Sequence, residues 1–466
     1  MQIPILSGTL TDASGDFRTT YPINMVPVPK DHGISKGYLR PAEGIVSFAD
    51  STGKSRGGML WNGEAYYVCG ARLLRVKEDG TTVDLGLIEG TDDVSFCFSF
   101  DRMGLCGGGK LYYLVGDILT QVTDDDLGTV NDVVWVDGYF VTTDGEFLIS
   151  TELADPTSVN PLKYGSSEID PDPVLRLLVN RNEIYAINRH TVEVFTNVGG
   201  EFFPFARING AHMQKGAVGR KAACVYSDAI AFVGSGRNEP PAVYMGENAQ
   251  TVKISTREID QTLGEYTEAE LATVVVESRT TMGHRFLYVH LPDKTLVYDS
   301  AATVYLEEPV WFVLTSSLDG FSKYRARHYV WAYNKWLCGD PTASKIGYLA
   351  NNTSHHYGEQ VRWEFGTMIV YAETGGAVFH ELELVCLTGR VEFGKNPIIT
   401  TSYTSDGVTW SQDRTCRVGT SGDRLRRIVW MQQGFMQHWR AQRFRGTSDA
   451  FISIARLEIR IEALIR

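Results

Sequence analysis

The sequence predicts an all-β protein with a β-propeller of about six to seven blades, a C-terminal β-sandwich-like domain and an N-terminal strap. Three observations support this prediction. Short apolar runs separated by turn residues recur from residue 55 to residue 350. Their spacing of about 40 residues is the period of four-stranded blades. After residue 355 the runs become longer and alternate apolar with polar residues, as strands with one buried face do.

The N-terminal residues 1–50 are rich in proline and irregular in pattern, so we expect an arm or strap. They lack a basic start followed by an apolar core, and apolar runs elsewhere fall far short of a bilayer span. We therefore expect no signal peptide, no membrane span and synthesis in a cytoplasm. The seven cysteines form no C-x-x-C pair, which favours free buried thiols.

Residues 51–352 are predicted to form the propeller. The stretch VVWVDGYFVTTDGEFLIS, residues 133–150, shows the pattern most clearly, with strands expected at 133–136, 139–143 and 146–150. Asp137-Gly138 and Asp144-Gly145 suit hairpin turns, because glycine adopts positive φ without steric cost. We interpret these aspartates as turn residues and not as catalytic or metal-binding groups.

One helical insertion is expected in the propeller, near residues 266–278. Thr267 can cap a helix, and Glu270 follows three residues later, which is the spacing of a capping box. The C-terminal domain is assigned to residues 353–466. Its final strand is expected at 452–461, where apolar and charged residues alternate.

The charge is unevenly distributed. The formal net charge is −12, but residues 417–466 contain ten Arg, no Lys and four acids, which gives 10 − 4 = +6. Residues 1–416 therefore sum to −12 − 6 = −18. An acidic balance of this kind disfavours non-specific binding to DNA.

Arginines gather around an apolar, Trp-containing run near the C-terminus: Arg424, Arg426, Arg427, Arg440, Arg443 and Arg445. Arginine forks to carboxylates and phosphates and stacks on aromatic rings. One hypothesis is contact with DNA phosphates along a channel. The other, which the acidic remainder of the chain favours, is an interface between subunits or domains.

No catalytic, cofactor-binding or metal-ligating set is predicted. Residues 404–410, TSDGVTW, resemble a shortened Asp-box, a structural hairpin motif of sialidase propellers. Residues Asp124–126 do not match a calcium loop, and His355-His356 lacks further ligands nearby in the sequence, so a surface turn is expected there.

Several stretches together resemble the packaged-DNA stabilisation proteins of short-tailed phages, also called tail hub or nozzle proteins. These stretches are YPINMVP at 21–27, GYLRPAEG at 37–44, ISTELADPTS at 149–158, MQKGAVG at 213–219, the capping-box helix, and LPDKTLVYD at 291–299. Their order and spacing carry the resemblance over nearly the whole chain.

The resemblance implies a virion structural protein without catalytic residues. It implies a homohexameric ring in the tail, below the portal and head-to-tail adaptor, made in the host cytoplasm. Such a ring completes the DNA channel, retains packaged DNA without sequence-specific binding, and anchors a tail needle or plug and tailspikes or fibres. Two alternatives remain at this point: a propeller glycosidase or depolymerase acting on host-surface glycan, and a monomeric interaction module. Arginines and paired carboxylates converging on the propeller axis would favour the enzyme.

Overall fold

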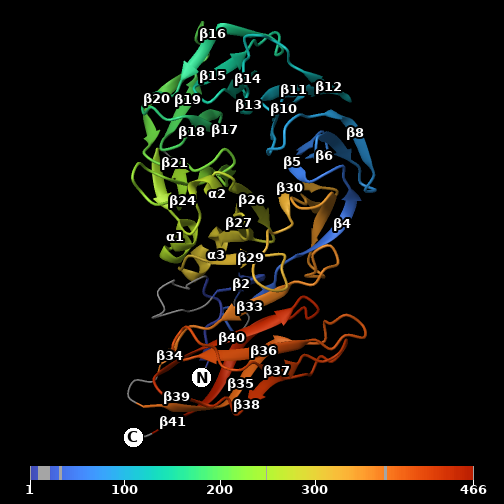
Figure 1. Ribbon diagram of the computed structural model, residues 1–466, viewed down its shortest axis with the longest axis vertical. Coiled ribbons are helices and arrows are strands. Elements are labelled where there is room, and N and C mark those ends of the chain that lie inside the picture. The colour runs from blue at the N-terminus through green and yellow to red at the C-terminus, as the bar shows by residue number, and fades with distance from the viewer. Residues whose placement is uncertain (1, 9–20, 31–33, 248, 372–374, 465–466) are drawn as a thin grey trace.

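A computed structural model describes residues 2–8, 21–30, 34–247, 249–371 and 375–464. Figure 1 shows a ring of small β-sheets at one end of the long axis and a second all-β domain at the other. The all-β fold with a propeller followed by a C-terminal domain is therefore confirmed. Among the described residues, no helix has the length and apolar character of a membrane span.

The first four blades are antiparallel sheets of four consecutive strands. Blade 1 comprises β5 (Ser55–Trp61), β6 (Glu64–Cys69), β7 (Arg72–Val76) and β8 (Thr82–Leu87). Blade 2 comprises β9 (Ser95–Phe98), β10 (Met103–Gly107), β11 (Lys110–Val115) and β12 (Ile118–Gln121). Blade 3 comprises β13 (Asp132–Val136), β14 (Tyr139–Thr143), β15 (Phe147–Thr151) and β16 (Val159–Ser166). Blade 4 comprises β17 (Val174–Asn180), β18 (Glu183–Asn188), β19 (Val192–Asn197) and β20 (Phe205–Met213).

Three further sheets complete the ring, giving seven blades in the described chain. Blade 5 comprises β21 (Gly216–Ala217), β22 (Ala223–Tyr226), β23 (Ala229–Ser235), β24 (Ala242–Glu247) and β25 (Gln250–Lys253). Blade 6 comprises β26 (Val275–Thr281), β27 (His284–His290), β28 (Thr295–Asp299) and β29 (Trp311–Leu314). Blade 7 comprises β30 (Arg327–Ala332), β31 (Lys335–Gly339), β32 (Lys345–Ala350) and β4 (Gly44–Asp50). The helices are α1 (Arg257–Gly264), α2 (Glu268–Leu271) and α3 (Ser300–Leu306).

The ring is closed by pairing between distant parts of the chain. The inner strands β5, β9, β13, β17, β22, β26 and β30 contact one another in succession, and β30 contacts β5. The N-terminal strand β4 pairs antiparallel with β32 and completes blade 7. Apolar side chains fill the space between blades, as where Tyr67 of blade 1 packs in one cluster with Leu337 of blade 7. Each blade thus obtains its core from its neighbours.

The C-terminal domain packs two sheets face to face. One contains β2 (Met25–Pro29), β3 (Gly37–Pro41), β41 (Ser453–Ala463), β35 (Ala377–Leu387) and β38 (Ile428–Met431), with β1 (Gln2–Ile3) and β39 (Phe435–Met436) attached. The other contains β33 (Arg362–Gly366), β40 (Trp439–Thr447), β36 (Ile398–Thr404) and β37 (Arg414–Arg417), with β34 (Val370–Tyr371) attached. A single apolar core lies between them, built around Trp363, Phe365 and Phe444.

The N-terminal segment is divided between the domains, and this differs from a separate strap at 1–50. Strands β1, β2 and β3 belong to the sandwich, whereas β4 belongs to blade 7. Prolines in β2 and β3 interrupt the alternation of apolar and polar residues, and partners distant in the sequence decide the pairing of these strands.

The two Asp-Gly pairs of blade 3 were both predicted to form turns between strands. Asp137 and Gly138 both have positive φ, 49° and 89°, and join β13 to β14 as a two-residue hairpin. At the second Asp-Gly pair, the Asp144 carboxylate instead accepts hydrogen bonds from the amides of Glu146 and Phe147, at 2.8 and 2.7 Å. The third strand consequently begins at Phe147, one residue later than predicted.

The helical insertion is present but shorter than predicted. The capping box forms: Thr267 accepts from the Glu270 amide, and the Glu270 side chain accepts from the Thr267 amide. However, α2 ends at Leu271, and the chain enters β26 at Val275. Burial of Val275 and Val276 in blade 6 overrides the helical tendency of the local sequence.

We expect Arg279→Met to lower the free energy of unfolding by about 3–5 kcal/mol, because it leaves a buried carboxylate without its partner. Arg279 is buried, forms an ion pair with Glu43 just before β4, and donates to the Tyr288 hydroxyl at 2.8 Å. Burial alone would raise the pKa of Glu43, but the charge and hydrogen bond of Arg279 lower it overall. Urea unfolding followed by tryptophan fluorescence measures the effect.

Arg285→Met is the matched control, because Arg285 is exposed on the neighbouring strand β27. A surface change of this kind alters stability by at most about 0.5 kcal/mol. Equal losses in the free energy of unfolding of the two variants would contradict the structural role given to Arg279.

Candidate functional site

Residues 22–24 pass between the propeller and the sandwich and bond to both. The Ile23 amide donates to the Glu364 carbonyl at 2.8 Å, and the Glu364 amide donates back to Ile23 at 3.0 Å. On the other side, the Asn24 amide donates to the Val313 carbonyl at 2.8 Å, and the Val313 amide donates to the Pro22 carbonyl at 2.9 Å. This short segment therefore links β33 of the sandwich to β29 of blade 6.

Asn24 strengthens the same link with its side chain. Its amide nitrogen donates to the carbonyls of Thr315 and Arg362, at 2.9 and 2.7 Å, and its oxygen accepts from the Thr315 amide at 3.0 Å. Asn24 is 3% exposed, and its φ is 51°. Asparagine is one of the few residues that adopt this left-handed conformation readily. Asparagine therefore fits this position in two ways: its side chain makes the three hydrogen bonds, and its backbone adopts the positive φ.

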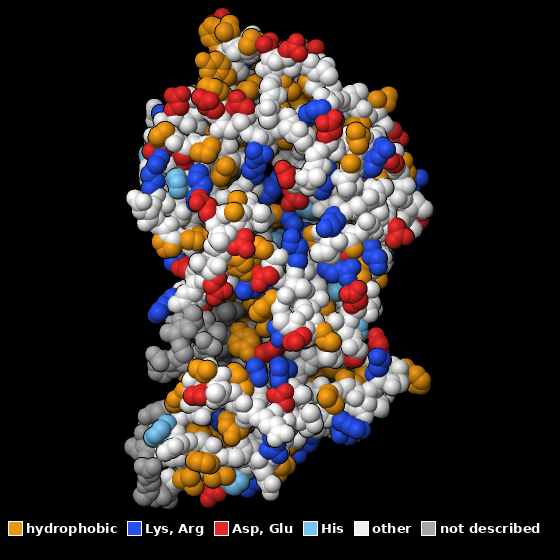
Figure 2. Space-filling model, in the orientation of Figure 1, with side chains coloured by type: hydrophobic (Ala, Val, Ile, Leu, Met, Phe, Trp, Pro, Cys, Tyr) orange, Lys and Arg blue, Asp and Glu red, His pale blue; other side chains and the backbone are white. Residues whose placement is uncertain are grey.

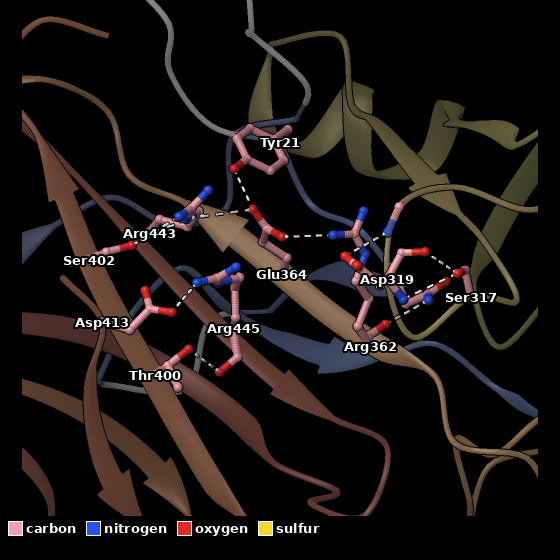
Figure 3. A network of polar contacts seen from close by, with 12 residues as sticks. Tyr21, Ser317, Asp319, Arg362, Glu364, Thr400, Ser402, Asp413, Arg443 and Arg445 are labelled. Atoms are coloured by element: carbon pink, nitrogen blue, oxygen red, sulfur yellow. Dashed lines mark hydrogen bonds and ion pairs between the residues drawn. The ribbon is translucent and has the colours of Figure 1, made fainter. Parts of the chain in front are cut away.

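A cluster of four side chains lies beside this link; we call Tyr21, Arg362, Glu364 and Arg443 the junction cluster (Figure 3). The buried Glu364 carboxylate accepts a hydrogen bond from the Tyr21 hydroxyl. It also lies 3.3 Å from Arg362 Nη1 and 3.9 Å from Arg443 Nε. Burial, followed by the negative charge of Glu364, raises the pKa of Tyr21. Two guanidinium groups thus compensate one buried carboxylate at the domain boundary.

Three of the six predicted arginines lie on β40. Arg443 belongs to the junction cluster and stacks on the Trp410 ring, with 4.0 Å to its centroid. Arg445 forms an ion pair with Asp413 (Figure 3). Arg440 is 1% exposed, lies over the Tyr403 ring and donates to the Gln433 carbonyl, and burial lowers its pKa to about 10. Arg440 is therefore enclosed within the sandwich, away from its surface.

The other three arginines precede β38 and are exposed. Arg427 forms ion pairs with Glu381 and Glu383 of the adjacent strand β35. Arg424 and Arg426 lie in the loop between β37 and β38, and within the described chain neither forms an ion pair. The structure therefore places Arg440 and Arg443 in internal contacts, Arg445 in a half-exposed ion pair, and Arg424, Arg426 and Arg427 on the surface.

An axial cavity of about 690 Å³ runs along the inner strands of the propeller. Its charged lining residues are Asp93, Asp132, Arg176, Lys221 and Glu277. Figure 2 shows acidic and basic side chains close together in the middle of the propeller face. Lys221, which precedes β22 of blade 5, donates a hydrogen bond to Ser95 Oγ of blade 2. Charged residues thus converge on the propeller axis, the arrangement that would favour an enzyme.

The electrostatics of these carboxyl groups do not suit acid catalysis. Burial would raise the pKa of Glu277, but the His290 imidazole 3.4 Å away and nearby positive charges hold it at about 2. Burial opposes ionisation of Asp93 in the same way, and the Arg327 charge at 2.7 Å lowers its pKa overall. A glycosidase requires one carboxyl group with a raised pKa as general acid. Asp93 and Glu277 have the opposite property.

One set of possible metal ligands occurs among the described residues: His355, Glu392 and Asp449, whose ligand atoms lie within 4.8 Å of one another. The Asp449 carboxylate already contacts His355 at 3.2 Å and lies 3.9 Å from Lys395 Nζ. A neighbouring ammonium group opposes cation binding. The expectation of a surface turn at His355-His356 was wrong for His356, which is 1% exposed.

Comparison with known sequences identifies similar proteins for both domains. Residues 1–354 match a family model described as bacteriophage P22 Gp10, beta-propeller, and residues 362–462 match one described as bacteriophage P22 Gp10, beta-sandwich. The tail hub protein gp10 of Salmonella phage P22 is 26% identical over 485 residues, covering 99% of each chain.

Solved structures show weaker likenesses. The Pan2 WD40 domain of Neurospora crassa has a TM-score of 0.42 and 10% identity, covering 67% of this chain and 97% of that one. PorZ of Porphyromonas gingivalis has a TM-score of 0.39 and 9% identity, covering 65% of this chain and 37% of that one.

We expect Asn24→Ala to lower the free energy of unfolding by about 2–3 kcal/mol, because buried carbonyl and amide groups lose their partners. The propeller and sandwich should also unfold in separate calorimetric transitions. Asn238→Ala is the matched control, because Asn238 also has positive φ, 57°, but is exposed. If both variants behave alike, backbone strain and not the hydrogen bonds of Asn24 explains the effect.

Stability should also fall as the pH drops from about 6.5, the ordinary pKa of histidine. Burial, with a smaller effect of the Arg325 charge, lowers the pKa of His356 to about 3. Below pH 6.5 the unfolded chain binds a proton at His356 that the folded chain does not bind, so stability is lost until the pH approaches 3. The contribution has a maximum slope of about 1.4 kcal/mol per pH unit.

Chemical denaturation of His356→Gln at a series of pH values tests this contribution. Its stability should depend less steeply on pH between 6 and 4 than that of the unmodified chain. His438→Gln, at an exposed position, should leave the slope unchanged. Parallel curves for the His356 variant and the unmodified chain would rule out this contribution.

Proposed function

The chain belongs to the bacteriophage P22 Gp10 family, and from this membership we propose that it is a structural tail hub, or nozzle, protein of a phage virion. Membership confirms the resemblance noted in the sequence. The observation that carries the proposal is the match to a tail hub protein over 99% of both chains. The match includes both domains and the segment that links them.

The proposed assembly is a ring of six copies below the portal and adaptor. In it, each copy forms one sector of the wall, and the genome passes through the centre of the ring. The axis of a single propeller is unsuited to DNA, because Lys221 reaches across it from blade 5 to blade 2. The net charge of −12 favours a channel wall that repels the phosphates of DNA, so that the DNA slides along it.

The proposed role includes retaining packaged DNA and anchoring a tail needle or plug and tailspikes or fibres. A part in this position must transmit force without separating its domains. The backbone hydrogen bonds of residues 22–24 to both domains, together with the junction cluster, supply such a connection. We favour this role over a glycosidase because Asp93 and Glu277 have lowered pKa values.

The test is the mass of the purified chain, measured by light scattering alone and with portal–adaptor complexes. We expect six copies to bind each complex, whether or not the ring also forms alone. Portal without adaptor is the control and should bind no ring. A chain that remains monomeric in the presence of the adaptor would show that this role is wrong.

A further inference from the structure

Two loops of the sandwich lie together and form an exposed surface that we call the basic flank, residues 387–398 and 417–427. The Gly422 amide donates to the Gly389 carbonyl at 3.0 Å, and Thr388 Oγ1 donates to the Asp423 carbonyl at 2.9 Å. The Val418 amide likewise donates to the Pro397 carbonyl at 3.0 Å. The flank is thus a defined surface, held by hydrogen bonds between the two loops.

The basic flank combines cationic and apolar side chains. Four of its arginines are exposed and form no ion pair within the described chain: Arg390, Arg417, Arg424 and Arg426. Four large apolar side chains are exposed beside them, with Phe393 96% and Leu425 95% exposed, together with Leu387 and Ile398. Arginine and large apolar residues are typical of protein interfaces, and a concentration of exposed apolar groups marks an interaction site.

A surface of opposite charge lies on blade 3 and the loop before it; we call residues 123–127 and 152–164 the acidic crest. The Val159 amide donates to Asp124 Oδ2 at 3.0 Å, which joins the two segments. Asp125, Asp126 and Asp155 are exposed and form no ion pair within the described chain. Exposed apolar side chains accompany them: Leu153, Leu162 and Tyr164.

The crest and the flank lie far apart in one molecule. Strand β16, within the crest, lies at the end of the long axis opposite the sandwich (Figure 1). Red and orange side chains gather at this same end in the space-filling view (Figure 2). One copy therefore cannot bring its own flank onto its own crest.

We propose that the basic flank of one copy docks on the acidic crest of the next copy. The charges agree with this, because residues 417–466 sum to +6 and residues 1–416 to −18. Apolar groups on both surfaces would be removed from water in the same contact. Contact between two different surfaces is head-to-tail, and such a contact generates a ring when its rotation closes. This inference rests on the proposed ring and specifies its interface.

Charge reversal on each surface tests the proposal in the full chain with portal–adaptor complexes. The flank variant is Arg424→Glu with Arg426→Glu, and the crest variant is Asp125→Lys with Asp126→Lys. Either variant alone opposes like charges at every contact, so at least tenfold more protein should be needed to form rings. Lys77→Glu, at an exposed turn of blade 1, is the matched control and should assemble as the unmodified chain does.

Mixing the two variants gives the decisive result. A reversed flank then meets a reversed crest, and an unchanged flank meets an unchanged crest, if the copies alternate around the ring. We expect rings containing three copies of each variant, resolved by native mass spectrometry.

Three other outcomes would overturn the inference: normal rings from either variant alone, no recovery on mixing, or loss of adaptor binding with ring formation unaffected. In the last case, the flank would face the adaptor. Failure of the unmodified chain to assemble would instead overturn the proposed function, so the two failures are distinguishable. Thermal unfolding of each variant excludes loss of the fold as the cause.

Discussion

The structure depends on one constraint: the N-terminal segment must complete both domains. It bonds to both domains at residues 22–24, then adds β2 and β3 to the sandwich, and continues into β4, which completes blade 7. Neither the ring nor the larger sandwich sheet is complete without it. Pairings of this kind join residues roughly 300 or more positions apart, as between β4 and β32 or β3 and β41. Long-range contacts of this kind slow folding, because the chain between the paired strands must first be closed into a loop.

The buried carboxylates of Glu43 and Glu364 are paired with opposite charges, whereas Arg424 and Arg426 of the basic flank form no ion pair within the described chain. Inside, the buried Glu364 carboxylate has Arg362 and Arg443 as basic partners, and the buried Glu43 carboxylate has Arg279. Such pairs make the orientation of neighbouring elements specific, because a misplaced partner leaves a charge buried in an apolar environment. On the basic flank, Arg424 and Arg426 have no such partners. Phe393 and Leu425 are exposed on the same flank, and a concentration of exposed apolar side chains marks an interaction site.

Much of the propeller was predictable because blade strands form locally. Successive strands within a blade are joined by short turns, and the residues of such turns have a clear signature, as at Asp137-Gly138. The capping box at Thr267 is equally local and was identified correctly. The length of that helix was not predicted, because burial in blade 6 determines where β26 begins. The six arginines were recognised as a group, but only their tertiary contacts separate the enclosed Arg440 from the exposed Arg424 and Arg426.

The sequence by itself determined the all-β class, the repeated blades, the change of pattern after residue 355, and the family to which the chain belongs. All of these depend on residues close together or on motifs read in order. Only the tertiary structure decided that β4 closes the ring, that residues 22–24 bond to both domains, and that Glu364 lies between two arginines. The physical reason is that strand pairing and charge compensation are set by distance in space, which the spacing of residues along the chain does not encode.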